Sequence, residues 1–134
     1  MKVTLKSTDN LDHYTATNEA GHSVALSADG SATGPMQAVL MAVAGCSTID
    51  IVMILKKMRQ DIQHIEVEVD GTRQEEIPRV YTKIHLHYKI YGKVKEKKAE
   101  QAVALSLEKY CSVSLMLEKA AEISSSWEII EETT

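Results

Sequence analysis

Phenylalanine is absent from this sequence, and tryptophan occurs once, at Trp127. Aromatic residues make up only 4% of the chain, so a surface for stacking nucleic-acid bases is not expected. The net charge of −4 points the same way, because proteins that bind nucleic acids or anionic membranes present clustered positive charge. We therefore expect neither a nucleic-acid partner nor a membrane partner.

Export and domain-boundary signals are also lacking. No apolar segment follows the first residue in MKVTLKSTDN, so no signal peptide is expected and a cytoplasmic location is predicted. In that reducing compartment the two cysteines, Cys46 and Cys111, are expected to be buried thiols or a redox pair rather than a structural disulfide. No repeat, low-complexity segment or linker is visible, which predicts a single domain over residues 1–134.

The pattern of apolar residues predicts a mixed fold. The expected elements are three short strands within 2–27, a helix from Pro35 to about Gln60, strands at 64–70 and 80–90, helices at 95–110 and 112–123, and a closing strand at 124–132. The segments 28–34 and 71–78 are expected to be loops. The order βββ-α-ββ-αα-β, with strands in runs, is typical of the α+β class with antiparallel sheets.

The first predicted helix is unusually apolar. Between Ala38 and Leu55 it carries one charged residue, Asp50. This stretch lies at the lower length limit of a membrane span, but the small and polar residues 45–48 interrupt it and no other segment supports a membrane protein. A helix that is apolar on all sides is more simply covered on all sides, and one small chain does not readily supply that cover. A homodimer is therefore expected.

Each cysteine lies in an apolar helical context, Cys46 in AVAGCSTID and Cys111 in EKYCSVS. Such a residue is either a small buried hydrophobic side chain or a reactive thiol, and the two thiols would meet if their helices pack together. Asp50 follows Cys46 by one helical turn and is either paired with a Lys or Arg or part of a thiol site. A carboxylate disfavours a neighbouring thiolate, so activation of Cys46 would require a cation from elsewhere.

An H-x-H pair, His85 and His87, lies on one face of a predicted strand. Two imidazoles on one face are compatible with a metal site. Lys83 and Lys89 share that face and would repel a cation, so a solvated basic surface is favoured. Neither a metal nor another cofactor is expected.

Two segments together resemble a known family. GPMQAVLMAVAGCS at 34–47 and EKYCSVS at 108–114 are similar to the OsmC/Ohr family, which comprises osmotically inducible protein C and the organic hydroperoxide resistance proteins. CSTID at 46–50 with EKYCSVSLMLEKA at 108–120 is most similar to the YhfA-type branch. The resemblance spans nearly the whole chain.

The resemblance implies an OsmC-like fold in an intertwined homodimer, with two sheets wrapped around long central helices and thiol sites at the subunit interface. It implies that Cys46 attacks an organic hydroperoxide or a related apolar electrophile, that Cys111 resolves the product as a disulfide, and that a dithiol reductant restores both. Asp50 and Glu108 are further candidates for the catalytic site. The alternative is a dimer of the same fold that only binds a small apolar ligand or a partner.

The chain departs from the peroxidase pattern at three positions. Peroxidase members place an N-terminal Arg near the thiolate, whereas the first arginine here is Arg59. Met36 stands where those members carry a Glu, and Ser112 follows the second cysteine where they usually carry a Pro. The thiol pair is therefore present without the recognisable charged pair that activates it.

Overall fold

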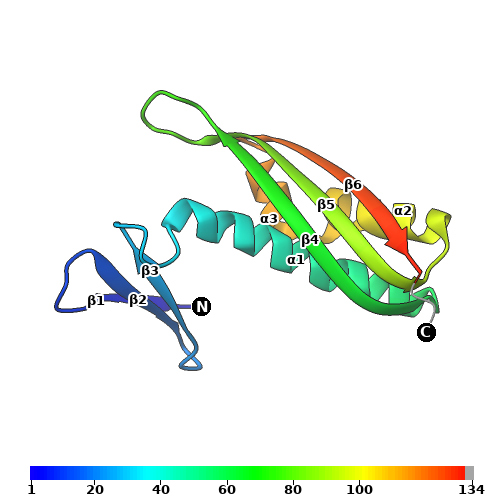
Figure 1. Ribbon diagram of the computed structural model, residues 1–134, viewed down its shortest axis with the longest axis horizontal. Helices are drawn as coiled ribbons and strands as arrows, with labels where there is room; N and C mark the ends of the chain where they lie inside the picture. The colour runs from blue at the N-terminus through cyan, green and yellow to red at the C-terminus, as the bar shows by residue number, and fades with distance from the viewer. Residues whose placement is uncertain (132–134) are drawn as a thin grey trace. The chain divides into compact units, whose positions relative to one another are not determined.

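The computed structural model describes residues 1–131 (Figure 1). Contacts divide the chain into two compact units, Met1–Val39 and a second that begins at Leu40, and each is described separately. The α+β class and the predicted element order are confirmed. That residues 1–134 form one domain stays a prediction.

The first unit is a three-stranded antiparallel meander. It comprises β1 (Val3–Ser7), β2 (His13–Asn18) and β3 (Ser23–Ser27), with β2 in the centre. The three strands lie within the predicted segment 2–27. The loop that follows β3 is folded back on the sheet, because Ser27 Oγ accepts a hydrogen bond from the Ala32 amide at 2.8 Å.

The second unit contains the second sheet, in the order β4-β5-β6. Its strands are β4 (Asp61–Arg73), β5 (Tyr81–Lys93) and β6 (Glu122–Ile130). β4 and β5 are antiparallel, but β5 and β6 are parallel, so the expectation of wholly antiparallel sheets is wrong for this pair. The physical reason is the connection, since parallel neighbours require a crossover and the helices between β5 and β6 supply it.

Both long strands extend further than predicted. β4 continues through Gly71 to Arg73, which shortens the expected loop 71–78. β5 runs past Gly92 to Lys93, beyond the predicted end of that strand at position 90. Gly92 has φ of 131°, and a Cβ atom there would lie 2.2 Å from the carbonyl oxygen of Asp61, so a residue without a side chain lets the two strands pair across the adjacent bulge.

The described part of the chain has four helical segments: α1 (Pro35–Lys57), α2 (Glu96–Leu105), the π-helical turn η1 (Ser106–Tyr110) and α3 (Ser112–Leu117). α1 ends three residues before the predicted Gln60 because Arg59 adopts a left-handed conformation. The predicted helix 112–123 is wrong beyond Leu117. Glu122 and Ile123 instead pair with Lys83 and Ile84 of β5, so tertiary strand pairing overrides the local helical pattern.

The core of the second unit lies between the sheet and the helices on one of its faces (Figure 1). α1 contributes a buried stripe at four-residue spacing, Val43, Ser47, Ile51 and Leu55. The central strand turns one face to this core, because Ile84, Leu86, Tyr88 and Ile90 are all fully buried. This arrangement presses the middle of α1, which carries Cys46 and Asp50, against the segment that carries Cys111.

Candidate functional site

The structure brings together three predicted site residues. Cys46 Sγ, Cys111 Sγ and a carboxylate oxygen of Asp50 all lie within 4.8 Å of one another. Cys46 and Asp50 come from successive turns of α1, and Cys111 comes from the junction between η1 and α3. Both cysteines are free thiols. The sulfurs are therefore neighbours without being bonded.

Burial distinguishes the two thiols. Cys111 is fully buried, whereas Cys46 is half-buried. Burial raises the pKa of the Cys111 thiol, hydrogen bonds from Ser114 lower it in part, and the neighbouring Cys46 raises it further. Cys111 is therefore held in the protonated form at neutral pH, and Cys46 is the thiol that faces approaching molecules.

Ser106 links the segments that carry the two thiols. Its hydroxyl lies 3.1 Å from the carbonyl oxygen of Ser47 and 3.4 Å from Oδ2 of Asp50, so one proton is shared between two acceptors on α1. Its carbonyl oxygen accepts a hydrogen bond of 2.6 Å from the Cys111 amide. This last bond spans five residues and closes the π-helical turn, a feature that is frequent at functional sites.

A buried tyrosine braces the same part of α1 from the sheet side. The Tyr88 hydroxyl on β5 donates to Ser47 Oγ at 2.6 Å, and Ser47 Oγ donates to the Ala44 carbonyl oxygen at 3.3 Å. Burial raises the pKa of Tyr88, so its hydroxyl stays a donor. Ser47, the residue next to Cys46, is thus held to β5 through its side chain and to η1 through its carbonyl oxygen.

Asp50 forms no ion pair with any of the described residues. Within residues 1–131, no Lys or Arg nitrogen lies within 4.0 Å of its carboxylate, so the predicted alternative of a structural ion pair is wrong for this part of the chain. Its hydrogen-bond partner is the Ser106 hydroxyl. Asp50 therefore belongs to the thiol cluster.

Gln37 follows Met36, the residue that stands where peroxidase members carry a Glu, and it has a structural role at the start of α1. The Gln37 side-chain oxygen accepts a hydrogen bond of 2.9 Å from the Gly34 amide, just before the first helical residue, Pro35. This is one half of a capping box, in which a Gln in the first turn satisfies the amide that precedes the helix. Gln37 stabilises the start of α1.

A cavity of about 400 Å³ lies next to the thiol cluster on the Asp50 side. Its lining is mainly apolar and comprises Asp50, Met53, Ile54, Lys57, Met58, Leu105 and Tyr110. Methionine side chains adapt to irregular apolar ligands. This cavity offers an apolar binding surface whose charged residues are Asp50 and Lys57.

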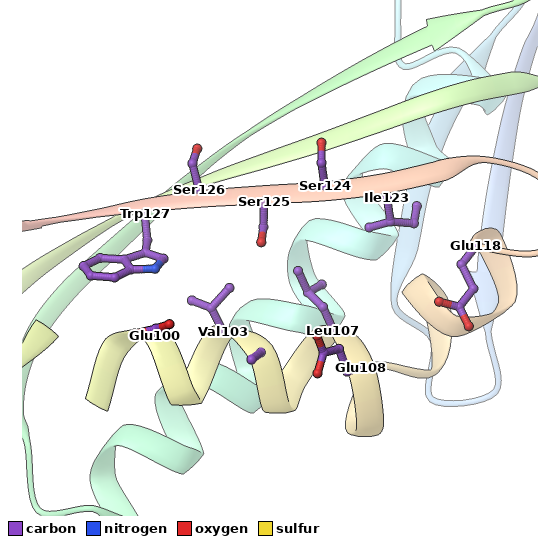
Figure 2. Close-up of a pocket in the computed structure, with 11 residues that line it drawn as sticks. Glu100, Val103, Leu107, Glu108, Glu118, Ile123, Ser124, Ser125, Ser126 and Trp127 are labelled. Carbon is purple, nitrogen blue, oxygen red and sulfur yellow. The ribbon is translucent and has the colours of Figure 1, made fainter. Parts of the chain in front are cut away.

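Glu108, the remaining candidate, is placed elsewhere. It lines a separate cavity of about 300 Å³ between the helical segment and β6, together with Glu100 and Glu118 (Figure 2). Ser125 and Trp127 point from β6 toward the helices in this view, whereas Ser124 and Ser126 point to the opposite face of the strand. Glu108 is thus grouped with other carboxylates and not with the thiols.

The two histidines of the H-x-H pair face serine hydroxyls. His85 ring nitrogens lie 2.7 Å from Ser124 Oγ and 2.9 Å from Ser126 Oγ, and His87 Nδ1 lies 2.6 Å from Ser126 Oγ. His87 Nε2 is also 3.6 Å from a carboxylate oxygen of Glu128. In the described part of the chain, the cluster of three potential metal ligands is at Cys46, Asp50 and Cys111 instead.

Sequence comparison identifies the family. The family model described as OsmC-like protein matches residues 28–126. The chain belongs to the OsmC-like protein family. It is 46% identical over 114 residues to Protein YhfA of Escherichia coli (strain K12), an alignment that covers 83% of this chain and 85% of that protein.

Solved structures agree with this assignment. A protein from Aquifex aeolicus VF5 is 34% identical, with a TM-score of 0.91 and coverage of 98% of this chain and 97% of that one. An organic hydroperoxide resistance protein OsmC from Legionella pneumophila is 17% identical, with a TM-score of 0.72 over 96% and 97% of the two chains, and shows a shared fold. By length and composition alone α1 could cross a bilayer, but the apolar core helix of a soluble fold passes the same test.

Sequence reasoning missed the supporting residues. Ser47, Ser106 and Tyr88 are ordinary residues in the printed sequence, and no spacing rule connects positions 41 to 59 residues apart. The one available signal was the polar side chain of Ser47 at the same helical spacing as the buried Val43 and Ile51.

Proposed function

We propose that this OsmC-like protein reduces organic hydroperoxides through Cys46 and Cys111. The observation that carries the proposal is the approach of the two sulfur atoms to within 4.8 Å from separate elements. A disulfide requires a sulfur–sulfur distance of about 2.05 Å, so bond formation needs only a local movement. Structural relatives named for organic hydroperoxide resistance support the same chemistry.

The unequal burial of the thiols assigns their roles in this proposal. Cys46 is the accessible one and acts as the nucleophile. Cys111 is buried and kept protonated, which suits a thiol that reacts only after its neighbour has been oxidised. Its sulfur also accepts a hydrogen bond of 3.4 Å from the Ser114 amide, which holds it in place.

The reaction proceeds in three steps. The Cys46 thiolate attacks the terminal oxygen of the hydroperoxide; the S–O bond forms, the O–O bond breaks, and the alkoxide takes up a proton and leaves as the alcohol. Cys111 then loses its proton and attacks the sulfenic sulfur, forming the disulfide and releasing water. An external dithiol reduces the disulfide by thiol exchange and is itself oxidised to a disulfide.

The apolar cavity beside Asp50 accommodates the organic part of the substrate in this proposal. Met53, Ile54 and Leu105 supply apolar surface, so an alkyl or aryl hydroperoxide is favoured over hydrogen peroxide. Because Asp50 is a carboxylate rather than a cation, we expect slower turnover than in peroxidases that hold an Arg beside the thiolate.

Peptide mapping tests the proposal. Reduced protein is treated with a slight excess of cumene hydroperoxide and digested without reductant, and a Cys46–Cys111 cross-linked peptide is expected. Cys46→Ser should abolish peroxide consumption, and Cys111→Ser should leave a sulfenic acid on Cys46 that a dimedone probe traps. If both cysteines remain free thiols in folded protein, hydroperoxide reduction is refuted and the alternative, an OsmC-like fold that binds an apolar ligand, takes its place.

We propose that the protein acts as a homodimer in the cytoplasm, where dithiol reductants are available. α1 supports the dimer, since only 22% of its most apolar 18-residue window is buried within the chain. Met41, Ile49 and Met53 are 53–62% exposed and form a stripe opposite the buried one, with Gly45 between them. A second copy of the chain would cover this stripe.

Sedimentation velocity at micromolar concentration tests the dimer. The wild type should sediment at about twice the chain mass. Ile49→Glu, which places a charge on the exposed apolar stripe, should shift the protein toward monomer, whereas Gln101→Glu on the exposed surface of α2 should not. A wild type that sediments as a folded monomer would refute the dimer.

A further inference from the structure

We propose that Cys46, Cys111 and Asp50 form a binding site for a thiophilic divalent cation, Zn²⁺ in particular. Their three potential ligand atoms lie within 4.8 Å of one another. Tetrahedral zinc with Zn–S bonds of about 2.3 Å holds its sulfur ligands about 3.8 Å apart, so the cluster needs to contract by roughly 1 Å or less. The proposal itself does not depend on hydroperoxide reduction.

The donor set selects the kind of metal. Two thiolates are soft ligands that favour zinc over magnesium or calcium, which prefer sites built from oxygen. One carboxylate oxygen provides a third ligand of a type found in zinc sites. The fourth position would be left to water or a small molecule, on the side where Cys46 and Asp50 are half-buried rather than sealed.

Charge balance favours the binding of a cation by this cluster. Metal binding removes the two thiol protons to solvent and brings two thiolates and one carboxylate together, which a divalent cation stabilises. Asp50 has no Lys or Arg partner among residues 1–131 to neutralise it. No cation in this part of the chain has to be displaced from the carboxylate when the metal enters.

The surrounding hydrogen bonds already orient the ligands. The Ser106 hydroxyl lies 3.4 Å from Oδ2 of Asp50, and the Ser106 carbonyl oxygen holds the Cys111 amide. Hydrogen bonds of this kind to a ligating carboxylate fix its direction in metal sites, and their loss typically weakens metal binding about 10–100-fold. Ser106 is therefore a positioning residue for the metal.

Metal binding and disulfide formation exclude each other, because the same two sulfur atoms cannot ligate the metal and bond to one another. This consequence rests on the proposed function. With a hydroperoxide as oxidant, the zinc-bound thiolates would form the disulfide, the peroxide and two protons would give alcohol and water, and Zn²⁺ would be released. Zinc would conversely protect the reduced thiols.

Cobalt provides a spectroscopic test of the site itself. Reduced, metal-free protein titrated with Co²⁺ under argon should develop thiolate-to-metal charge-transfer absorption and the visible bands of tetrahedral cobalt, saturating at one ion per chain. Zn²⁺ should bleach both, and millimolar Mg²⁺ should not. Absence of the charge-transfer band in folded wild-type protein would overturn the proposal.

Variants assign the ligands. Competition with a chromophoric zinc chelator should show zinc affinity at least roughly 100-fold lower in Cys46→Ser and in Cys111→Ser, because each removes one of only three protein ligands. Asp50→Asn should lose at least about 10-fold, and Ser106→Ala about 10-fold. Asp70→Asn, an exposed carboxylate on β4, is the matched control and should bind as the wild type does. Unchanged affinity in Asp50→Asn or in either cysteine variant, with circular dichroism showing a native fold, would refute this ligand set.

Two measurements separate this proposal from the proposed function. In the first, metal-free protein is treated with cumene hydroperoxide and its free thiols are counted. In the second, zinc-loaded protein is treated in the same way and a zinc-binding dye follows the release of the metal. Thiols that stay free in a protein that binds cobalt through sulfur would refute hydroperoxide reduction and leave the metal site intact. Disulfide formation in a protein that gives no charge-transfer band would refute the metal site alone.

Discussion

The two three-stranded sheets of this protein differ in what covers them. In the sheet β4-β5-β6 every second residue of the central strand from Ile84 to Ile90 is fully buried under helices of the same unit. In the sheet β1-β2-β3 no residue of β1 is buried, and Val3 and Leu5 are 68% and 55% exposed. One sheet is therefore stabilised by its own chain, whereas the other depends far more on strand pairing.

A leucine-to-alanine substitution in each sheet gives the strongest test of this difference in stabilisation. Leu86→Ala removes a fully buried side chain and should lower the free energy of unfolding by about 2–5 kcal/mol. Leu5→Ala removes a side chain that is 55% exposed and should cost about 1 kcal/mol or less. Urea unfolding at one fixed protein concentration measures both. Equal losses would mean that the first sheet is covered in solution and that the contrast does not hold.

A matched pair of tyrosines tests the same contrast with a hydrogen bond. The Tyr88 hydroxyl donates to Ser47 Oγ inside the core, and the Tyr14 hydroxyl on β2 donates to the Leu11 carbonyl oxygen near solvent. Tyr88→Phe should cost about 1–2 kcal/mol because Ser47 loses a donor that water cannot replace. Tyr14→Phe should cost less than about 0.5 kcal/mol, since water can bond to Leu11. Equal unfolding midpoints for the two variants would contradict this.

The sequence predicted those features of the two sheets that follow from local residue patterns. Alternation of apolar and polar residues located the strands of both sheets, and alternate residues of β5 from Ile84 to Ile90 are buried. Local pattern failed where tertiary contacts decide. The segment after Leu117 has a helical pattern, but pairing with β5 makes Glu122 and Ile123 part of a parallel strand.

In the candidate site, too, some contacts follow from local spacing and others depend on tertiary packing. Cys46 and Asp50 share one face of one helix, so their proximity follows from spacing alone. The approach of Cys111 was conditional on helix packing, and the bonds of Ser106 and Tyr88 to Ser47 span 59 and 41 residues. No periodicity relates such distant positions. The family resemblance, not the residue pattern, indicated that the two thiols would meet.

Backbone conformation provides a smaller test. In the first unit the turn after β2 has φ of 90° at Gly21, which costs glycine little, whereas in the second unit the end of α1 has φ of 59° at Arg59. Arg59→Gly should therefore raise the free energy of unfolding by about 0.5–1 kcal/mol, because removal of left-handed strain outweighs the entropy that glycine adds to the unfolded chain. Gly21→Ala should lower it by about 1 kcal/mol. Thermal unfolding of both variants measures this, and a destabilised Arg59→Gly would show that the arginine side chain has a stabilising role.

The smallest expected effect is electrostatic and lies in the first unit. Asp29 accepts hydrogen bonds from the Ser31 hydroxyl and amide at 2.6 and 3.0 Å, and its carboxylate is 3.0 Å from Nε2 of His13. The Ser31 hydrogen bonds, with a further contribution from His13, lower the pKa of Asp29 well below its usual value. A carboxylate whose pKa is lower in the folded state than in the unfolded state stabilises the fold at pH values above the unfolded-state pKa, which is near 4. That stability is lost as the pH falls through the folded-state pKa.

Asp29→Asn should therefore lower the melting temperature slightly at pH 7, and the difference from the wild type should shrink as the pH falls below about 4. Differential scanning calorimetry of both proteins at pH 7 and pH 3 measures the change. A difference that is the same at both pH values would show that the asparagine disturbs the loop by its shape, and that charge on Asp29 does not stabilise the first unit.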